Sequence, residues 1–458
     1  MPITSTHPEY NHFVRDWQDC RTAYEGQRAV KDAGVRYLPR LRGQSPADYD
    51  AYKGRALFYS ITSKTLSALT GMAMDQVPVI DHPSEMDYIF KDHSGMGFYK
   101  VFGPTILEVL LTGRFGAFVD RPANGGKPYI TLYRTEDIIN WEVSDDDVLQ
   151  MVVLRERYVD RSSSDMFTQQ IKVRYRHLYL EDGIVKVQVH ESGNSVGLNN
   201  VYDQVGRPMS IVNTGVPMTE IPFFCVTANG IGLDPCKSPV QDIVDINFSH
   251  YRSSADLEHG RHFTGLPTPW ITGAESQAAM HIGSTKAWVI PDAGAKVGFL
   301  EFTGLGLQSL EKALAEKQAQ LASLSARLID NSSRGSEAEG TVRMRYASET
   351  SSLRQVVRSV EAFLNLVFNC VAKMEGYEAV KVQLPTDFLG GRMTAAELKA
   401  WTDAYLGGAI PKEVFIHALR AGKSLPPPGE EMGKFPDPPA QSQPQPQPTP
   451  SNTPQPQQ

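Results

Sequence analysis

The sequence is poor in cysteine. Only 4 of its 458 residues are cysteines, and none belongs to a C-x-x-C pair or to a Cys/His set with zinc-finger spacing. We therefore expect free thiols and a protein made in a reducing compartment, where disulfides are not used. The four residues are Cys20, Cys225, Cys236 and Cys370.

An excess of positive charge and a long apolar run are also missing. The net charge is −7, from 45 Lys and Arg against 52 Asp and Glu. This balance excludes a free-standing DNA grip of the histone or repressor kind, which needs clustered cations to displace counterions, but it does not exclude DNA that the protein merely surrounds. No stretch approaches the ~18 apolar residues of a membrane helix. The segment MPITSTHPEYNHFVRDW lacks the cationic start and apolar core of a secretory signal. We expect a soluble protein.

Motifs of known catalytic chemistry are absent as well. GSTK at 283–286 lacks the upstream glycine-rich run of a phosphate-binding loop, and there is no H-E-x-x-H or G-x-S-x-G motif. GIGL at 230–233 and GLG at 304–306 are isolated glycine turns rather than a dinucleotide fingerprint. We expect no cofactor and no enzymatic activity.

One group of residues could be drawn as a metal cluster. It contains His250, Asp256, His259 and His262. His259 and His262 straddle Gly260, where we expect a helix to end, so they would not share one metal-facing side. We interpret them as polar residues at a helix end and expect no metal site.

The N-terminal part favours helices. Apolar residues recur at helical spacing over 9–33, 46–73 and about 97–112, and we expect a helix in each range. Ser45 is a typical N-cap, and Pro46 suits the first helical position.

Between 113 and 228 the chain turns to strands. PYITLYR, LQMVVLRERYV and IKVRYRHLYL are rich in Val, Ile, Tyr and Phe with partial alternation. LEDG at 180–183 indicates a hairpin turn between two strands. Because strands and helices do not alternate here, the pattern predicts an α+β fold.

Two helical segments flank a small β-rich excursion at 263–303. The first follows Ser238 and Pro239 and is expected to end at Gly260. The second carries leucines at the spacing of an a/d seam, with Lys317 where one more leucine would fit. Such a stripe is usually core, but two helices joined by a small cap form a stalk with little body, which favours packing against further copies. The seam residues are Leu307, Leu310, Leu314, Leu321, Leu324 and Leu328.

A polar stretch at 330–341 follows this second helix. It can be read as a solvated linker, or as a flexible loop between two long helices that faces something charged. The residues of the second reading are Asp330, Asn331, Ser332, Ser333, Arg334, Glu337 and Glu339, with Arg327, Arg343 and Arg345 as flanking cations.

The remainder is expected to be helical and then disordered. A helix over 342–375 would be about 51 Å long, far beyond the usual length in compact enzymes. A small helical unit over 394–422 opens with a capping box at Thr394 and Glu397, and its second helix starts at Ile410 and Pro411. Residues 424–458 hold 12 of the 31 prolines, which predicts a disordered Pro/Gln tail.

This order of segments resembles the portal proteins of tailed bacteriophages. The run YLPRLRGQSPADYDAYKGRALFYSITSKTLSALTGM is similar to one subfamily, as are CKSPVQDIVDINFSHYRSSADLEHGRHFTGLPTPWITG and the Arg-rich return after 341. The resemblance covers about residues 10–422 and contains no catalytic motif. It leaves the Pro/Gln tail without a match in the family pattern.

The resemblance implies a role for each segment. Residues 1–236 with 342–378 would form the wing, 237–262 and 304–329 the two stem helices, and 263–303 the clip. Residues 330–341 would be the tunnel loop facing DNA, 379–423 a short crown and 424–458 the tail.

The resemblance also implies partners and a place. The protein would form a ring, expected to be dodecameric, at one vertex of the virion capsid, after assembly in the cytoplasm of the bacterial host. Double-stranded DNA would pass through it without sequence reading, driven in by the terminase large subunit and later ejected. Head-completion or adaptor proteins, the major capsid protein and scaffolding protein would be further partners, and no membrane is involved. Another phage head-tail adaptor protein, or a metal-dependent nuclease built on scattered carboxylates, are the alternatives.

Overall fold

The computed structural model divides the chain into two compact units, residues 1–386 and 387–458. It describes most of the first unit and a helical part of the second. The described ranges are 2–75, 77–91, 96–122, 125–160, 169–192, 202–210, 212–213, 216–265, 268–272, 294–300, 304, 306–329, 351–386, 388 and 395–421.

Four helices open the first unit, where two were predicted. They are α1 (Pro8–Glu25), α2 (Gln27–Asp32), α3 (Pro46–Arg55) and α4 (Ile61–Met74). The prediction of one helix over 9–33 is wrong because Gly26, with φ at +89°, takes a backbone conformation that ends α1. The N-cap prediction is confirmed, since the Ser45 side chain accepts a hydrogen bond from the Asp48 amide at 3.2 Å.

The predicted helix over 46–73 is interrupted at 56–60. Ala56 has an extended backbone, with ψ at 140°, and Phe58 is 6% exposed. The Phe58 amide donates to the Gln27 side chain at 3.2 Å. The carbonyl of Tyr59 accepts from the Asn247 amide group at 2.8 Å. The chain leaves the helix here because burial of Phe58 and these two tertiary hydrogen bonds replace the helical ones.

The body of this unit is built on helix α6 and two antiparallel sheets, and the predicted α+β class is confirmed. Helix α6 (Gly97–Thr112) has the predicted bounds and leads through Gly113 into β2, whose seven residues are all buried. One sheet has the order β12-β11-β2-β3 and the other β4-β5-β6-β7-β8. Their strands are β2 (Arg114–Asp120), β3 (Tyr129–Arg134), β4 (Ile138–Val143), β5 (Leu149–Asp160), β6 (Gln170–Glu181), β7 (Ile184–Ser192), β8 (Tyr202–Ser210), β11 (Phe223–Thr227) and β12 (Gly230–Ile231).

The hairpin predicted at LEDG is confirmed. Strands β6 and β7 pair up to Glu181 and Ile184. The two residues between them, Asp182 and Gly183, have φ values of 53° and 73°. Positive φ at both central positions is typical of the tight turn that suits the twist of a hairpin.

A helix of 25 residues, α10 (Ser351–Glu375), packs its apolar side into the body. It also holds a strand pair that the sequence did not indicate, β1 (Val79–Asp81) with β15 (Lys381–Gln383). The side chains of Asn365 and Asn369 each exchange two hydrogen bonds, of 2.8 to 2.9 Å, with the β15 segment at Val382 and Val380. The predicted end of α10 at Glu375 is confirmed, and its predicted start lies outside the described residues.

Apart from two further long helices and the strands between them, the remaining elements of this unit are short. The short ones are η1 (Gly34–Arg36), η2 (Ser84–Met86), α5 (Asp87–Phe90), η3 (Thr135–Asp137), β9 (Val212–Asn213) and β10 (Val216–Pro217). All four cysteines are free, as predicted. Burial raises the pKa of the Cys20 and Cys370 thiols to about 12, so neither is a reactive thiolate at neutral pH.

The second unit contains two helices, α11 (Ala395–Leu406) and α12 (Lys412–Ala421). Tyr405, Phe415 and Leu419 form its buried core, and Trp401 and Ile410 pack against it. The rings of Tyr405 and Phe415 are stacked, with centroids 4.6 Å apart. The two-helix prediction is therefore confirmed, while the capping residue Thr394 lies outside the described part of the chain.

Candidate functional site

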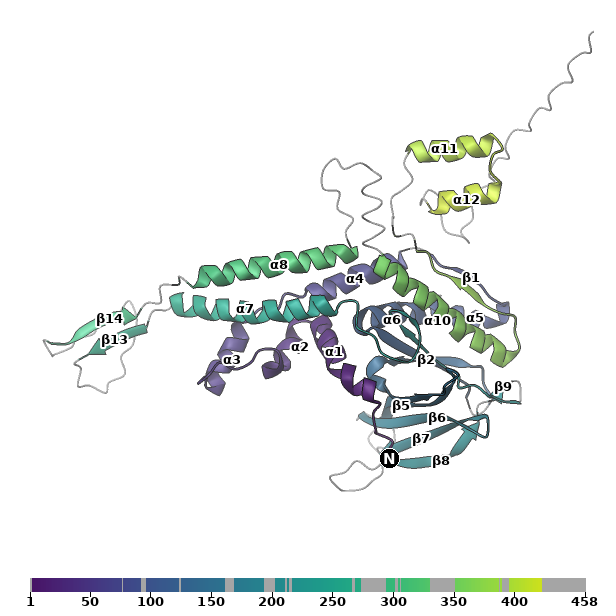
Figure 1. Cartoon of the computed structure of the whole chain (residues 1–458), viewed down its shortest axis with the longest axis horizontal. Coiled ribbons are helices and arrows are strands. Elements are labelled where there is room, and N and C mark those ends of the chain that lie inside the picture. Colours follow the sequence, from purple (N-terminus) through teal and green to yellow (C-terminus); the bar gives the residue numbers. More distant parts are fainter. Residues whose placement is uncertain are drawn as a thin grey trace, which may run out of the picture. The chain divides into compact units, whose positions relative to one another are not determined.

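Two long helices in the first unit lie side by side and run antiparallel (Figure 1). They are α7 (Gln241–Gly265) and α8 (Leu307–Ile329). Between them the chain contains a two-stranded antiparallel ribbon, β13 (Thr268–Thr272) with β14 (Lys296–Leu300). The small β-rich excursion between paired helices is thus present, and we call α7, the ribbon and α8 the hairpin arm.

The predicted helix end at Gly260 is wrong, because α7 continues to Gly265. Gly260 serves a different purpose. A Cβ atom built on it would lie 2.4 Å from Cδ2 of Leu307, the first residue of α8. Gly260 therefore allows the two helices to approach closely at this end of the arm. Because the helix is continuous, His259 and His262 both lie on it. In the part of the chain that the structure describes, no group of three or more His, Cys, Asp or Glu residues could hold a metal ion.

The residues of the supposed metal cluster have other partners. The Tyr52 hydroxyl of α3 donates to Asp256 at 2.6 Å. An Arg55 nitrogen of α3 lies 3.1 Å from Nδ1 of His259. Burial and then the nearby Arg55 lower the pKa of His259, although Asp256 opposes this. These residues join α3 to α7.

The leucine seam of α8 is interrupted by a polar layer that joins α8 to α7. The Lys317 ammonium donates to the Ser253 hydroxyl at 2.5 Å and to the Ser249 carbonyl at 3.3 Å. The next residue, Gln318, has its amide nitrogen 3.2 Å from Nε2 of His250. Burial and then Lys317 lower the pKa of His250. Since Lys317 needs these acceptors opposite it, this layer fixes the register of the two helices.

The structure places the seam leucines at the contact of α8 with its own chain. Leu314 and Leu321 are buried and Leu307, Leu310 and Leu324 are partly buried. Leu328 and Arg327 belong to α8, but their side chains are not described. The predicted tunnel-loop residues and the cations Arg343 and Arg345 lie outside the described residues.

The base of the arm is anchored to the N-terminal helices. The hydroxyl of Thr65 in α4 donates to Ser325 of α8 at 3.0 Å, and Thr62 donates to Asn247 of α7 at 3.0 Å. All four residues are buried. Helix α7 is buried along much of its length, whereas α8 has buried residues on one side only in its described part. Among the residues that the structure describes, the arm therefore exposes one face of α8.

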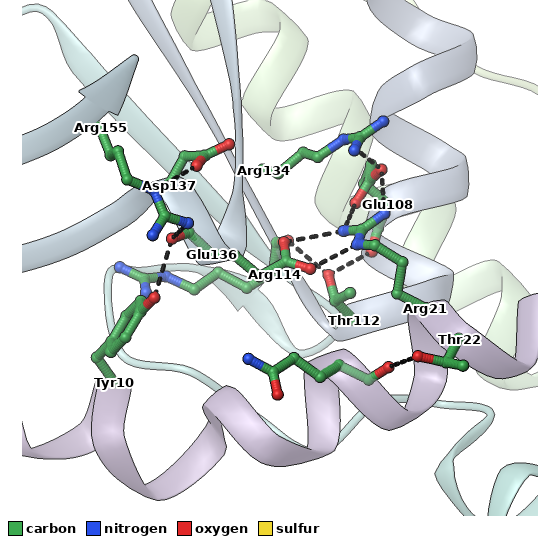
Figure 2. A network of polar contacts seen from close by, with 11 residues as sticks. Tyr10, Arg21, Thr22, Glu108, Thr112, Arg114, Arg134, Glu136, Asp137 and Arg155 are labelled. Carbon is green, nitrogen blue, oxygen red and sulfur yellow. Dashed lines mark hydrogen bonds and ion pairs between the residues drawn. The ribbon is translucent and has the colours of Figure 1, made fainter. Parts of the chain in front are cut away.

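An ion-pair network holds α1 against α6 and the sheets (Figure 2). Arg21 of α1 lies between Glu108 and Glu136, at 2.8 Å and 2.5 Å. Its side chain is 16% exposed, and the two carboxylates are 8% and 14% exposed. Burial would lower the pKa of Arg21, but the hydrogen bonds that it donates to both carboxylates outweigh this effect and raise the pKa. Arg134 lies 3.4 Å from Glu108 on its other side.

A second network occupies the contact of the two sheets. Arg176 of β6 pairs with Asp120 of β2 at 2.6 Å and with Glu156 of β5 at 2.8 Å. Burial would raise the pKa of Glu156, but Arg176, Tyr133 and Arg174 together lower it. These partly buried carboxylates are engaged by cations of the same chain, so they do not form an open carboxylate pair for a metal.

Sequence reasoning missed one concave feature beside α10. A hollow of about 600 Å³ lies between the start of this helix and the turn from β11 to β12. Arg354 and Arg358 line it from the helix, and Asn229 of the turn and Ile231 of β12 line it from the other side. Arginines four residues apart on a helix are a weak signal, because the sequence does not show what the opposite wall is.

The family described as a domain of unknown function, DUF4055, matches residues 239–374, which include α7, the ribbon and α8. No curated protein matches the chain. Similar solved structures include a chain of the neck of an empty GTA particle computed with C6 symmetry, with 14% identity and a TM-score of 0.40, covering 88% of this chain and 99% of that one. Another is a chain of the neck of a native GTA particle computed with C12 symmetry, with 15% identity and a TM-score of 0.39, covering 84% and 95%.

The described part of the chain has no helix long and apolar enough to cross a membrane.

Proposed function

We propose that this chain is a structural component of a phage-like particle, and within that class its portal protein. The hairpin arm carries this proposal. Two antiparallel helices of 25 and 23 residues with a small ribbon between them, and a further 25-residue helix later in the chain, are the elements that would serve as stem, clip and long wing helix in a portal protein. The arm is anchored at its base and exposes a face of α8 among the described residues, as a subunit of a ring requires.

In this proposal copies of the chain form a ring, expected to be dodecameric, through which double-stranded DNA enters and leaves the capsid. The ring performs no chemistry of its own. Its acidic composition suits this task, since a wall that bound DNA tightly would have to release it phosphate by phosphate during transport. The loop 330–341 is the expected point of transient contact with the DNA.

The ribbon is the proposed docking element for the terminase large subunit and later for head-completion proteins. It exposes large apolar side chains: Trp270 is 41%, Phe299 54% and Leu300 69% exposed. An isolated two-stranded ribbon is marginally stable at best. Trp270 and Leu300 lie on the same face of the ribbon, and exposed apolar groups that share a face are typical of surfaces that bind another protein. The body, with its two sheets, is the proposed contact for the capsid and scaffolding proteins.

Removal of the loop tests the conduit role. A variant lacking residues 331–340 is expected to assemble as the wild type does, because in this proposal the contacts between subunits lie on the arm and the body rather than on the loop. In a packaging assay it should retain less DNA than the wild type. Unchanged packaging and retention would remove the role given to the loop.

Metal-dependent cleavage of DNA by the purified chain would favour the nuclease alternative, and assembly on a finished portal of another sequence would favour the adaptor alternative.

A further inference from the structure

The hollow beside α10 is positively charged and has an apolar wall. Arg354 and Arg358 line it, and no acidic side chain is among its described lining residues. The Nε–H of Arg354 donates to the Thr386 carbonyl at 3.1 Å, which holds this side chain in place. Arg358 is exposed and has no ion-pair partner among the residues that the structure describes. Ile231, 47% exposed, adds an apolar surface beside the two cations.

The turn between β4 and β5 has the complementary character. It carries three consecutive acids, Asp145, Asp146 and Asp147, all exposed and without an ion pair in the described chain. Val143 and Val148 flank them and are 37% and 43% exposed. The turn thus presents negative charge between two apolar side chains. The hollow presents positive charge beside one apolar side chain.

Hydrogen bonds hold this acidic turn in a defined shape. The Ser144 amide donates to the Val148 carbonyl at 2.9 Å, and the Asp147 amide donates to the Ser144 carbonyl at 3.0 Å. The Val148 amide donates to the Ser144 hydroxyl at 3.3 Å. A turn that is already ordered loses little conformational freedom when it docks.

We propose that the acidic turn of one copy docks into the arginine-lined hollow of the next copy. This inference rests on the proposed ring. A ring needs a head-to-tail interface, in which two different and complementary surfaces of the same chain meet. The turn and the hollow are such a pair on one sequence. Complementary charges set the partner and the register, and the apolar neighbours are buried around them.

The apolar content decides between a protein partner and DNA. A DNA backbone offers phosphates but no apolar side chain to cover Ile231, whereas the turn offers Val143 and Val148 together with its carboxylates. The overall charge of −7 also favours a protein partner here, because a grip on phosphates needs clustered cations beyond two arginines.

Charge exchange tests the proposal. The variants are Arg358→Glu, Asp146→Lys and the double variant, in which every copy carries the reversed pair. Arg354 is left because of its bond to Thr386, and Asp147 because its φ of 59° suits few residues. Lys373→Glu, an exposed position on the same helix, and Glu378→Lys, an exposed acid, are the matched controls.

The readout is the protein concentration at half assembly, from mass photometry or sedimentation, with circular dichroism to show that each variant is folded. Each single variant is expected to raise that concentration by about tenfold or more, which corresponds to about 1.4 kcal/mol. The double variant should return to within about threefold of the wild type, and both controls should stay there.

Three results would overturn the proposal. Single variants that assemble like the controls would show that ring contacts lie elsewhere, while leaving the portal proposal intact. A double variant as poor as the sum of the singles would show that the two sites do not meet. Normal assembly of Arg358→Glu together with weaker DNA retention would assign the hollow to nucleic acid. A wild type that never assembles would instead overturn the proposed function itself.

Discussion

Replacement of Arg21 by methionine tests the network that joins α1 to the body. Arg21 is the cation between Glu108 and Glu136. Without it, Glu136 loses the partner of both its carboxylate oxygens. Among the described residues, Glu108 then keeps Arg134 alone as a cation, and the side chain of Arg134 is 56% exposed. Methionine preserves much of the length and apolar surface of the arginine, so the variant mainly removes charge and hydrogen bonds.

The expected loss in the free energy of unfolding is about 3–5 kcal/mol, the usual cost of leaving one partner of a buried ion pair without the other. Arg36→Met is the matched control. Arg36 pairs with Asp19 at 2.6 Å, but the two side chains are 33% and 22% exposed. More exposed pairs contribute about 0–1 kcal/mol, so this control should change stability much less.

Urea unfolding followed by tryptophan fluorescence measures both variants. Trp17 lies one helical turn before Arg21 and is 1% exposed, so it reports on this contact. The protein concentration is held constant, because assembly adds to apparent stability. Adding Glu136→Gln to Arg21→Met should recover about 1–3 kcal/mol, since the double variant no longer contains that unpaired carboxylate. An Arg21→Met loss no larger than that of Arg36→Met would refute the reasoning.

Three further outcomes follow from the contacts. Gly260→Ala should lower the thermal unfolding midpoint, at a cost of about 1–3 kcal/mol, because the Cβ of the alanine would collide with Leu307. Adding Leu307→Ala should restore part of the lost stability. A higher midpoint, as helix propensity alone predicts, would contradict this reasoning. Burial and then His190 lower the pKa of His177 to about 4. As the pH falls, the unfolded chain therefore binds the proton first, and the stability of the wild type should fall between about pH 6.5 and 4. In urea titrations, His177→Gln should lose less stability than the wild type between pH 7 and pH 5, and an equal loss would count against this. Asn365→Ala leaves two backbone groups of β15 without partners, which should destabilise this strand by about 2 kcal/mol. Limited proteolysis should therefore cut near β15 at a rate about tenfold higher or more than in the wild type. An unchanged cleavage rate would argue against the role of Asn365.

Local chemistry in the sequence predicted much of the fold. Ser45 with Pro46 marked the start of α3, and LEDG marked the turn between β6 and β7. The apolar spacing placed α6 at its observed bounds. Each of these signals acts over a few residues, through a cap, a pair of left-handed backbone positions or one helical face.

Two of the wrong predictions involve contacts from distant parts of the chain. Gly260 looked like a helix end, but its lack of a side chain makes room for Leu307 while the helix continues. The segment 56–60 reads as helical, but Phe58 is buried and Asn247 binds the backbone beside it. Local propensity does not contain such partners, so the sequence could not reveal them.

The sites outside the arm were hidden for the same reason. Arg21 lies 87 and 115 residues from its two carboxylates, and β1 pairs with a strand some three hundred residues later. The arginines of the hollow become a site only with the β11–β12 turn opposite them. The hairpin arm was accessible to sequence reasoning because its two helices carry long periodic patterns and its excursion is rich in Gly and Pro.

Electron microscopy of the purified chain tests the central claim most directly. The portal account predicts closed rings with a central channel, and sedimentation should give a mass that is a fixed multiple of the 50.7 kDa chain. Particles that remain monomeric at every protein concentration would contradict it.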